Sequence, residues 1–408
     1  MSCRHCGSPL ELCVIDLGFA PPSNAYRRVE DLHRPETTFP LRVFACESCW
    51  LVQTEDYAAA DALFTPDYAY FSSASRGWMA HAERYAEMVT GRLGLGADSM
   101  VIEVASNDGY LLRNFVAKGV PCLGIEPTDS TADAAEAAGV PTRRAFFGQA
   151  LAEALVAEGK AADLVAGNNV LAHVPDINDF VRGLATVLKP GGTVTLEFPH
   201  LLRLIEEVQF DTIYHEHYSY LSLSAVARVL ASAGLKAIDV EHLSTHGGSL
   251  RLWAARQDDA RAPGRAVAEA LAAEERAGLE RAETYAAFQT RANTVKDRFL
   301  EFLIAEKRAG RRVAAYGAAA KGNTLMNYAG LKTDLIAFVC DIAPSKQGML
   351  MPGSHIPILP PEALAVHRPD TVVILPWNIA DEVRSSQAHI REWGGRFAIA
   401  LPEMRVFD

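Results

Sequence analysis

Short apolar segments alternate with segments of helical periodicity through the middle of the chain, from residue 99 to residue 256. The apolar segments predict strands at 101–105, 122–125, 162–167, 193–198, 236–242 and 249–256. The segments between them predict helices at 111–118, 132–138, 177–188 and 224–233, and a turn at 189–192. Strands that alternate with helices in this way predict a doubly wound, mostly parallel α/β sheet.

A second α/β pattern begins at Arg311, with predicted strands at 313–316, 335–340, 371–375 and 397–400. Residues 257–308 are rich in Ala, Glu and Arg at helical spacing, which predicts long connecting helices. A further helix is predicted near 77–93, after an aromatic and serine-rich stretch. A chain of 408 residues is long enough for two or three domains, and we expect them at 1–65, 66–256 and 257–408.

The first fifty residues hold two C-x2-C pairs, Cys3 with Cys6 and Cys46 with Cys49. Each such turn directs two sulfurs toward one ion, and four thiolates satisfy a tetrahedral Zn²⁺. The pairs predict a small separate module that a closed, structural metal site stabilises, since so short a segment has little core. A disulfide pair is the alternative. The remaining cysteines are expected to be buried small apolar residues: Cys13, Cys122 and Cys340.

Charge and the N-terminal sequence narrow the choice of partners. The net charge is −11 and no basic stripe lies near the cysteine pairs, which argues against nucleic acid. The N-terminus lacks the apolar core of a signal peptide, and no apolar run is long enough for a membrane helix. We therefore expect a cytoplasmic protein with no membrane partner, in a compartment where reduced thiols favour metal over disulfide.

The segment at 101–110, VIEVASNDGY, runs from a predicted strand through a polar loop to the start of a predicted helix. Ligands of doubly wound sheets bind at that edge, and Gly109 lets the backbone approach a ligand closely. Glu126 ends the next strand, where a carboxylate can accept hydrogen bonds from both hydroxyls of a ribose. The loop lacks the glycines that the pyrophosphate of a dinucleotide requires. An ordinary structural turn is the alternative.

The segment at 213–220, IYHEHYSY, is dense in proton-transfer groups, with two imidazoles, one carboxylate and three phenols. His215 and His217 do not share a face of a helix, but they do share a face of an extended segment. A metal site on these two residues therefore stays open beside acid–base chemistry.

The segment at 316–323, YGAAAKGN, also follows a predicted strand and opens a predicted helix. The free N–H groups at the start of a helix suit an anion such as a phosphate, and Lys321 adds a positive charge. Asp341 ends the next predicted strand, where an acidic residue can bind a ribose. A plain tight turn explains the glycines nearly as well.

Together these features resemble one family, the sugar C-methyltransferases of antibiotic deoxysugar pathways. The resemblance covers essentially the whole chain, and the order of the three parts and the YHEH and GAAAKGN stretches carry it. It implies a four-cysteine zinc module, a central class I methyltransferase domain with a Rossmann-like fold, and a second Rossmann-like domain that binds the sugar nucleotide.

The central region shows both matches to class I methyltransferases and one departure from them. Glu103 and Gly109 match the acidic and glycine positions of their cofactor loop, but Ala105 and Asn107 stand where glycines are usual. The stretches at 168–176 and 188–192 are similar to two later turns of such domains.

The family methylates nucleotide-linked 4-keto-6-deoxysugars, commonly at C-3, with S-adenosylmethionine as the methyl donor. A ketone at C-4 acidifies the neighbouring C–H, so a base can form an enolate that attacks the methyl group. The resemblance implies that His217 is this base, with His215 as the alternative. It also implies that Glu216 orients the sugar or the imidazole, that Tyr214 donates to the C-4 oxygen, and that His173 assists proton transfer.

The resemblance implies contacts to both substrates as well. S-adenosylmethionine is expected to contact Glu103, Ser106, Asn107, Gly109, Glu126, Pro127, Asn168 and Asn169. The dTDP-linked 4-keto-6-deoxysugar is expected to contact Tyr68, Phe71, Ser72, Arg76, Lys321, Asn323 and Asp341. The stretch at 246–250, HGGSL, either lines the sugar pocket or is a turn.

A monomer is expected from the same resemblance, and the choice between C-3 and C-5 as the methylated carbon stays open. Two other classes also stay open. One is an O- or N-methyltransferase that acts on a small metabolite. The other is a zinc-ribbon binding protein with degenerate Rossmann-like domains, because a fold alone does not fix a function.

Overall fold

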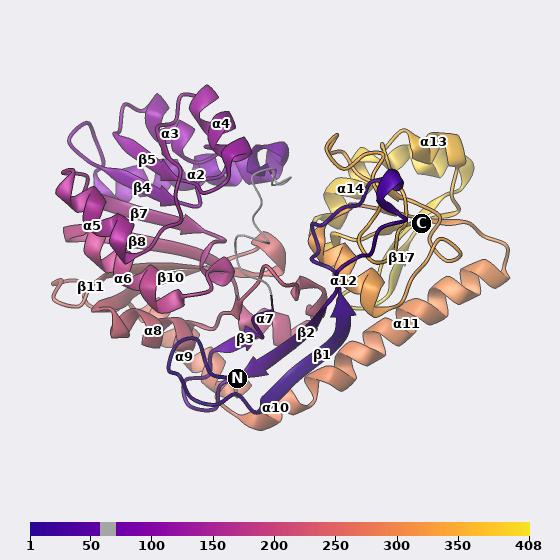
Figure 1. Ribbon diagram of the computed structural model, residues 1–408, viewed down its shortest axis with the longest axis horizontal. Helices are drawn as coiled ribbons and strands as arrows, with labels where there is room; N and C mark the ends of the chain where they lie inside the picture. Colours follow the sequence, from indigo (N-terminus) through magenta and orange to yellow (C-terminus); the bar gives the residue numbers. More distant parts are fainter. Residues whose placement is uncertain (58–70) are drawn as a thin grey trace.

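The computed structural model describes residues 1–57 and 71–408, and their strands form three sheets (Figure 1). The largest sheet has seven strands in the order β10-β11-β8-β7-β4-β5-β6. Its strands are β4 (Val101–Val104), β5 (Cys122–Ile125), β6 (Thr142–Arg143), β7 (Ala162–Asn168), β8 (Leu188–Pro199), β10 (Leu235–Leu243) and β11 (Ser249–Arg256). The five neighbouring strands β8, β7, β4, β5 and β6 are parallel, whereas β11 is antiparallel to β8 and β10. The predicted doubly wound, mostly parallel sheet is confirmed.

Helices pack on the two faces of this sheet because alternate residues of each strand point to opposite sides. Val101 packs with α2, α3 and α4 on one face, whereas Ile102 packs with α5, α6 and α8 on the other. These helices are α2 (Arg76–Leu93), α3 (Leu112–Ala117), α4 (Asp129–Ala137), α5 (Gln149–Ala157), α6 (Ile177–Val187) and α8 (Leu223–Ser232). The sequence prediction missed α5. The turn predicted at 189–192 lies inside β8, next to a shift in its register with β7.

Helix α6 shows how the local sequence sets such an element. The Asp176 side chain accepts a hydrogen bond from the Asp179 N–H at 2.9 Å and so caps the first turn. Its buried residues are three or four positions apart and form one apolar face: Ile177, Phe180, Val181, Leu184 and Val187. Burial of that face against the sheet places the loop before α6, which carries His173, at the carboxyl end of β7.

The C-terminal sheet has six strands in the order β14-β13-β12-β15-β16-β17. They are β12 (Val313–Tyr316), β13 (Val339–Cys340), β14 (Ile358–Leu359), β15 (Thr371–Ile374), β16 (Arg396–Ile399) and β17 (Arg405–Phe407), with helices α12 (Ala320–Tyr328), α13 (Ala363–His367) and α14 (Ala380–Ser386). The strand predicted at 335–340 is shorter because the N–H groups of Leu335 and Ile336 bond to the Lys332 carbonyl and form a turn.

The N-terminal sheet is completed by a strand from the middle of the chain. Its order is β1-β2-β3-β9, with β1 (Leu12–Ala20), β2 (Phe39–Ala45), β3 (Val52–Thr54) and β9 (Ser219–Tyr220). Strand β9 ends the YHEHYSY run and pairs with β3. The sequence predicted a separate module, but the structure differs because these residues share their sheet and core with the rest of the chain.

Two cores share the N-terminal residues. Cys3, Cys46 and Leu51 pack into the core of the large sheet, whereas Ile15 and Val43 pack with α11 and the C-terminal sheet. In this way a segment with little core of its own gains buried apolar contacts. Of the three unpaired cysteines, Cys122 and Cys340 are buried as predicted, but Cys13 is exposed because it lies on the outward face of β1.

Helices connect the two large sheets, as the sequence predicts. They are α9 (Arg265–Ala277), α10 (Ala282–Ala286) and α11 (Phe288–Arg308), and α11 runs along the molecule to the C-terminal domain (Figure 1). Helix α7 (Leu201–Glu206) and the short 3-10 helices complete the chain: η1 (Val29–Asp31), η2 (Ser72–Ala74), η3 (Leu171–His173), η4 (Phe210–Thr212), η5 (Thr245–Gly247), η6 (Trp377–Ile379) and η7 (Ala388–Trp393). Among the described helices, none has the length and apolar character to cross a bilayer.

Candidate functional site

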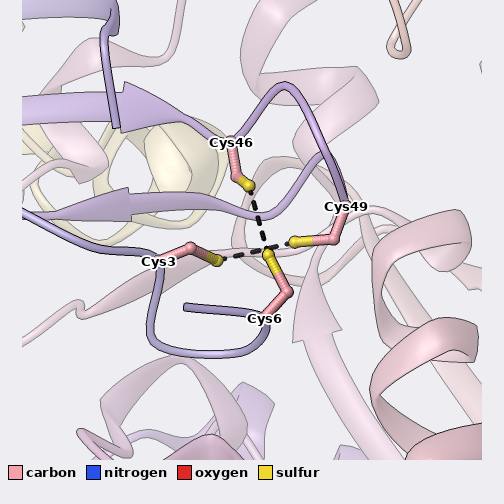
Figure 2. Close-up of side chains that lie close together, drawn as sticks. All are labelled: Cys3, Cys6, Cys46 and Cys49. Carbon is pink, nitrogen blue, oxygen red and sulfur yellow. Dashed lines mark hydrogen bonds between the residues drawn. The ribbon is translucent and has the colours of Figure 1, made fainter. Parts of the chain in front are cut away.

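Four cysteine sulfurs converge at the N-terminal module, as Figure 2 shows. The Sγ atoms of Cys3, Cys6, Cys46 and Cys49 all lie within 4.8 Å of one another, and the Cys3–Cys49 and Cys6–Cys46 pairs are each 3.5 Å apart. Zinc–sulfur bonds of about 2.3 Å in a tetrahedron separate the sulfurs by about 3.8 Å. The four sulfurs therefore fit one zinc ion, and none of these cysteines forms a disulfide.

A buried glutamine next to the zinc ligands was missed by the sequence analysis. The Gln53 side-chain amide donates to the Cys3 sulfur at 3.2 Å, and its oxygen accepts from the Arg4 N–H at 2.9 Å. The hydrogen bond with Cys49 lowers the pKa of the Cys3 thiol. A hydrogen bond to a metal ligand, such as the one from Gln53 to Cys3, orients that ligand toward the metal. Gln53 lies in β3, so the same strand contacts both the zinc ligands and β9.

His217 is held in one tautomer by its neighbours. Its Nδ1 lies 2.8 Å from the carbonyl oxygen of Thr212, and a carbonyl only accepts, so Nδ1 carries the hydrogen. Its Nε2 therefore has the lone pair and accepts from the Tyr214 hydroxyl at 2.7 Å. Burial, and next the neighbouring His173, holds the pKa of His217 well below its ordinary value. The ring is a neutral acceptor, which is the form that a general base needs.

His173 comes from another element to meet His217. It ends η3, and its ring centroid lies 4.6 Å from that of His217 in an edge-to-face arrangement. Burial lowers the pKa of His173 to about 4. The fold thus brings together three of the four predicted catalytic residues: Tyr214, His217 and His173.

Two further polar residues of the run, His215 and Glu216, face the N-terminal module. The His215 Nε2 lies 3.2 Å from the Pro40 carbonyl, and its ring packs edge-on against Phe39. Glu216 accepts a hydrogen bond from the Asn24 side chain at 3.1 Å. His215 and His217 therefore have different surroundings, and within residues 1–57 and 71–408 the four cysteines form the only group arranged for a metal. The metal site that the sequence left open at 215 and 217 is not supported.

Glu216 is a buried carboxyl with an incomplete set of partners. Its Oε2 has no hydrogen-bond partner in the described part of the chain, and burial raises the pKa of Glu216 from 4.5 to about 7. The imidazole of His217 is oriented by the Thr212 carbonyl rather than by Glu216. Of the two roles predicted for Glu216, orientation of the sugar is therefore the one that these contacts favour.

Substitution of Glu216 by glutamine is expected to stabilise the protein at pH 8 and to leave its stability nearly unchanged at pH 4. A raised pKa favours the protonated, folded form below about 4.5, and that contribution is lost as the pH rises through about 7. The shift corresponds to roughly 3 kcal/mol at most. Thermal unfolding of both proteins at both pH values measures it. Equal melting temperatures at pH 8 would contradict a buried, uncompensated carboxyl.

The predicted cofactor residues meet at one edge of the large sheet. Strands β5, β4 and β7 are neighbours, so their carboxyl ends lie side by side and bring the predicted contacts together. The Glu126 carboxylate accepts from the N–H groups of Asn107 at 2.9 Å and Thr128 at 3.0 Å. Glu103 is fully buried beneath the loop, and burial raises its pKa well above the ordinary value.

The cofactor loop keeps a glycine-like backbone without the usual glycines. Ala105 has a φ of 55° and Asn107 a φ of 49°, which is the left-handed region that glycine adopts most easily. Asn169, after β7, also has a positive φ of 54°. Gly109 has a φ of 75°, and a Cβ there would lie 2.8 Å from the Val140 side chain. The two residues that stand in place of the usual glycines therefore adopt a backbone conformation that glycine favours.

The predicted substrate contacts fall into two groups. The Ser72 N–H donates to the Asn107 side chain at 2.9 Å, so Phe71 and Ser72 lie beside the cofactor loop, with Arg76 exposed at the start of α2. Tyr68 lies outside the described residues. At the start of α2, next to Arg76, a Cβ on Gly77 would lie 3.8 Å from the Glu382 carboxylate of α14, so this end of the helix faces the C-terminal domain.

Two residues of the second group, Lys321 and Asn323, lie in the first turn of α12. This helix contacts the segment at 213–220, which is called the catalytic segment below because it holds the predicted base. The Thr324 hydroxyl donates to the Ile213 carbonyl at 2.8 Å. Lys321 donates to the Asn378 side chain at 2.7 Å and lies 5.0 Å from the centroid of the Trp377 ring. The Asn323 amide is buried, and neither of its side-chain atoms has a partner among the described residues.

Packing explains part of the C-terminal glycine motif. Gly317 has a φ of 91°, and a Cβ there would lie 2.4 Å from Pro376. The Asp341 carboxylate accepts from the N–H groups of Ala318 at 2.7 Å and Ala343 at 2.8 Å. Asp341 thus holds its loop in place, as Glu126 does at the cofactor loop, and its contact with a ribose stays a prediction.

A buried carboxylate beside the site, Glu197, was not singled out in the sequence, and the half-buried His246 was named there only as part of the HGGSL stretch. Glu197, near the end of β8, contacts His81 at 2.8 Å and Arg251 at 3.0 Å and accepts from the Thr245 hydroxyl at 2.9 Å. His246, which follows Thr245, has a φ of 56°, and its ring packs edge-on against Trp78. A charged residue inside an apolar strand was the available signal for Glu197.

Comparison with known proteins accounts for nearly the whole chain. Residues 3–64 match the family model described as "Putative zinc binding domain", residues 78–240 match "Methyltransferase domain" and residues 244–402 match "C-methyltransferase C-terminal domain". C-methyltransferase NovU of Streptomyces niveus is 36% identical over 406 residues, which cover 100% of this chain and 96% of that protein. The chain belongs to the C-methyltransferase family. The resemblance drawn from the sequence is therefore confirmed.

More distant relatives share only part of this C-methyltransferase. Ubiquinone biosynthesis O-methyltransferase of Methylobacterium sp. (strain 4-46) is 26% identical over 188 residues, which cover 42% of this chain and 74% of that protein. The solved structure of magnesium protoporphyrin IX methyltransferase (ChlM) from Synechocystis PCC 6803 with bound SAM covers 44% of this chain and 81% of its own, at 16% identity and a TM-score of 0.33. A likeness at that level carries no functional argument.

Membership of the family settles the class of protein and its cofactors. The protein is an S-adenosylmethionine-dependent C-methyltransferase with a structural zinc site. The two other classes left open by the sequence, an O- or N-methyltransferase and a zinc-ribbon binding protein, are set aside by the match along the full length.

Proposed function

We propose that the protein methylates C-3 of a dTDP-linked 4-keto-6-deoxysugar in antibiotic deoxysugar biosynthesis. The tautomer of His217 carries this proposal, because its Nδ1–H is held by Thr212 and leaves Nε2 as the basic atom. A carbon must lose a proton before it attacks a methyl group, whereas an alcohol or amine needs no base that forms an enolate. A buried, neutral imidazole next to a phenol meets that need.

The chemistry needs one base and one hydrogen-bond donor at adjacent carbons. His217 Nε2 takes the proton from C-3, and the electron pair of that C–H bond moves into an enolate whose charge lies on the C-4 oxygen. The Tyr214 hydroxyl donates to this oxygen. To reach both groups, the sugar enters at the hydrogen bond between Tyr214 and His217, so that one bond is replaced by two contacts with substrate. S-adenosylmethionine supplies the methyl group, which the enolate carbon attacks as the neutral thioether departs.

The remaining polar residues of the site support that reaction. His173, 4.6 Å from His217 between ring centroids, takes over the proton and returns the base to its neutral form. Glu216, whose Oε2 lacks a partner within the described residues, accepts a hydrogen bond from a sugar hydroxyl. The cofactor contacts are those predicted at the ends of β4, β5 and β7, so that the methyl group approaches from the large sheet.

The nucleotide half of the substrate is proposed to lie along α12. Lys321 is a half-buried lysine, and the Asn323 amide offers a donor and an acceptor that the described residues do not use. A phosphate can bind both groups at the start of the helix. Monomeric state and cytoplasmic location stay expectations from the sequence.

A reaction in deuterated water tests the proposal. Purified protein is incubated with S-adenosylmethionine and a dTDP-4-keto-6-deoxysugar, and mass spectrometry and NMR follow the sugar. The expected result is one added methyl on C-3. A methyl on C-5 would keep the enolate chemistry but overturn the assigned carbon. Deuterium uptake without a methyl would support the base and reject that sugar, and neither change across several such sugars would overturn the proposed substrate class.

A further inference from the structure

Arg4 lies between the zinc ligands Cys3 and Cys6 in the sequence, and its guanidinium contacts segments outside that turn. The side chain is only 6% exposed. Its NH1 donates to the Pro175 carbonyl and its NH2 to the Thr54 carbonyl, each at 3.0 Å. The NH2 also contacts the Asp56 carboxylate at 2.8 Å. Two contacts of one guanidinium therefore end on backbone carbonyls from different parts of the chain.

One of these carbonyls lies in the loop that follows His173, and the other lies in β3, which contacts the segment that carries His217. Pro175 is two residues after His173, in the loop between η3 and α6. Thr54 contacts the catalytic segment directly, because its hydroxyl donates to the His217 carbonyl at 3.2 Å and its N–H to the Tyr218 carbonyl at 3.1 Å. The Arg4 guanidinium carbon also lies 5.2 Å from the centroid of the Tyr218 ring.

The backbone of Arg4 is fixed from the other side. Cys3 and Cys6 are held by the metal, and the Arg4 N–H bonds to the buried Gln53 side chain. The adjacent His5 adds a further link, since its ring lies 2.7 Å from the Asn178 side chain, which also donates to the His5 carbonyl at 2.8 Å. Asn178 is in the first turn of α6, so the cysteine turn contacts both the loop that follows His173 and the helix after it.

We infer that Arg4 is a positioning residue that sets the distance between His173 and His217, and that zinc fixes the backbone of Arg4 through Cys3 and Cys6. This inference rests on the proposed function. Arginine suits the role because its planar fork donates in two directions at once, whereas lysine has a single point charge. The metal then does more than stabilise a module, since the turn it holds is the anchor for both halves of the proton-transfer pair.

The test compares Arg4→Met and Arg4→Lys with a matched control, Arg228→Met. Arg228 donates to the Cys49 carbonyl at 3.1 Å and pairs with Glu280, so it contacts the zinc centre from the other C-x2-C turn and not the catalytic segment. Arg4→Met is expected to lower kcat roughly 10- to 100-fold, the cost of a misplaced reacting group, with zinc content and the KM for S-adenosylmethionine unchanged. The kcat of Arg4→Lys is expected to lie between those of the wild type and Arg4→Met. Arg228→Met is expected to keep the wild-type kcat.

A second readout needs no sugar substrate. NMR titration of the histidine rings reports the His173–His217 pair directly, and Arg4→Met is expected to shift the His217 midpoint toward the ordinary histidine value while Arg228→Met leaves it in place. An unchanged kcat and midpoint in Arg4→Met, or the same loss in Arg228→Met, would overturn the inference. If Arg4→Met loses zinc, Arg4→Lys decides by the same measurements. If the wild type methylates no sugar, the proposed function fails and the titration still tests Arg4.

Discussion

His217→Asn is expected to slow methyl transfer by roughly 10²- to 10⁴-fold, the contribution typical of a positioned general base. The asparagine amide can still donate to the Thr212 carbonyl that His217 contacts at 2.8 Å, so the segment keeps its place. It has no atom that takes up a proton, so the enolate does not form. Single-turnover rates with a dTDP-4-keto-6-deoxysugar measure the loss, and deuterium exchange at C-3 is expected to fall with it.

Binding of the cofactor separates a chemical loss from a structural one. The predicted contacts of S-adenosylmethionine lie at the ends of β4, β5 and β7, whereas His217 lies beside β9, so calorimetry is expected to give an unchanged Kd. His215→Asn is the matched control, since that ring packs against Phe39 and the Pro40 carbonyl and should leave turnover nearly intact. Full activity of His217→Asn would move the base to His215 or His173.

The parts of the fold that follow from local pattern were predictable. Strand and helix periods gave the large sheet, and the C-x2-C spacing predicted four sulfurs that do converge on one point. The cofactor loop was harder, because Ala105 and Asn107 hide a glycine-like backbone behind residues that rarely adopt a positive φ. A sequence shows the residue type, but the loop conformation is set by the strands and helices around it.

The geometry of the catalytic segment was not predictable from residue types, because backbone atoms make much of it. The Thr212 carbonyl decides the tautomer of His217, and no side chain signals that contact. Strand β9 has only two residues and forms because β3 offers an open edge, which is a long-range pairing. For the same reason the sequence suggested a separate N-terminal module, whereas its sheet is finished by residues from the catalytic segment.

Removal of zinc is expected to have the largest effect on stability. Structural zinc contributes on the order of 10 kcal/mol to the folding of small modules, and this one has little core of its own. Cys3→Ser, or chelation of the wild type, should therefore lower the melting temperature and expose β2 and β3 to hydrogen exchange. Because β3 pairs with β9, exchange should also rise at Ser219 and Tyr220, while the C-terminal sheet stays protected.

Activity should disappear together with that protection, since the strand that loses its partner continues from His217. Cys13→Ser is the matched control, because Cys13 is exposed on β1 and lies outside the four-sulfur group, so its zinc content, melting temperature and turnover should match the wild type. Loss of activity at an unchanged melting temperature would mean that the metal takes part in the reaction rather than in the fold. An unchanged melting temperature with full activity would mean that the pairing of β3 with β9 and the shared core hold the catalytic segment without the ion.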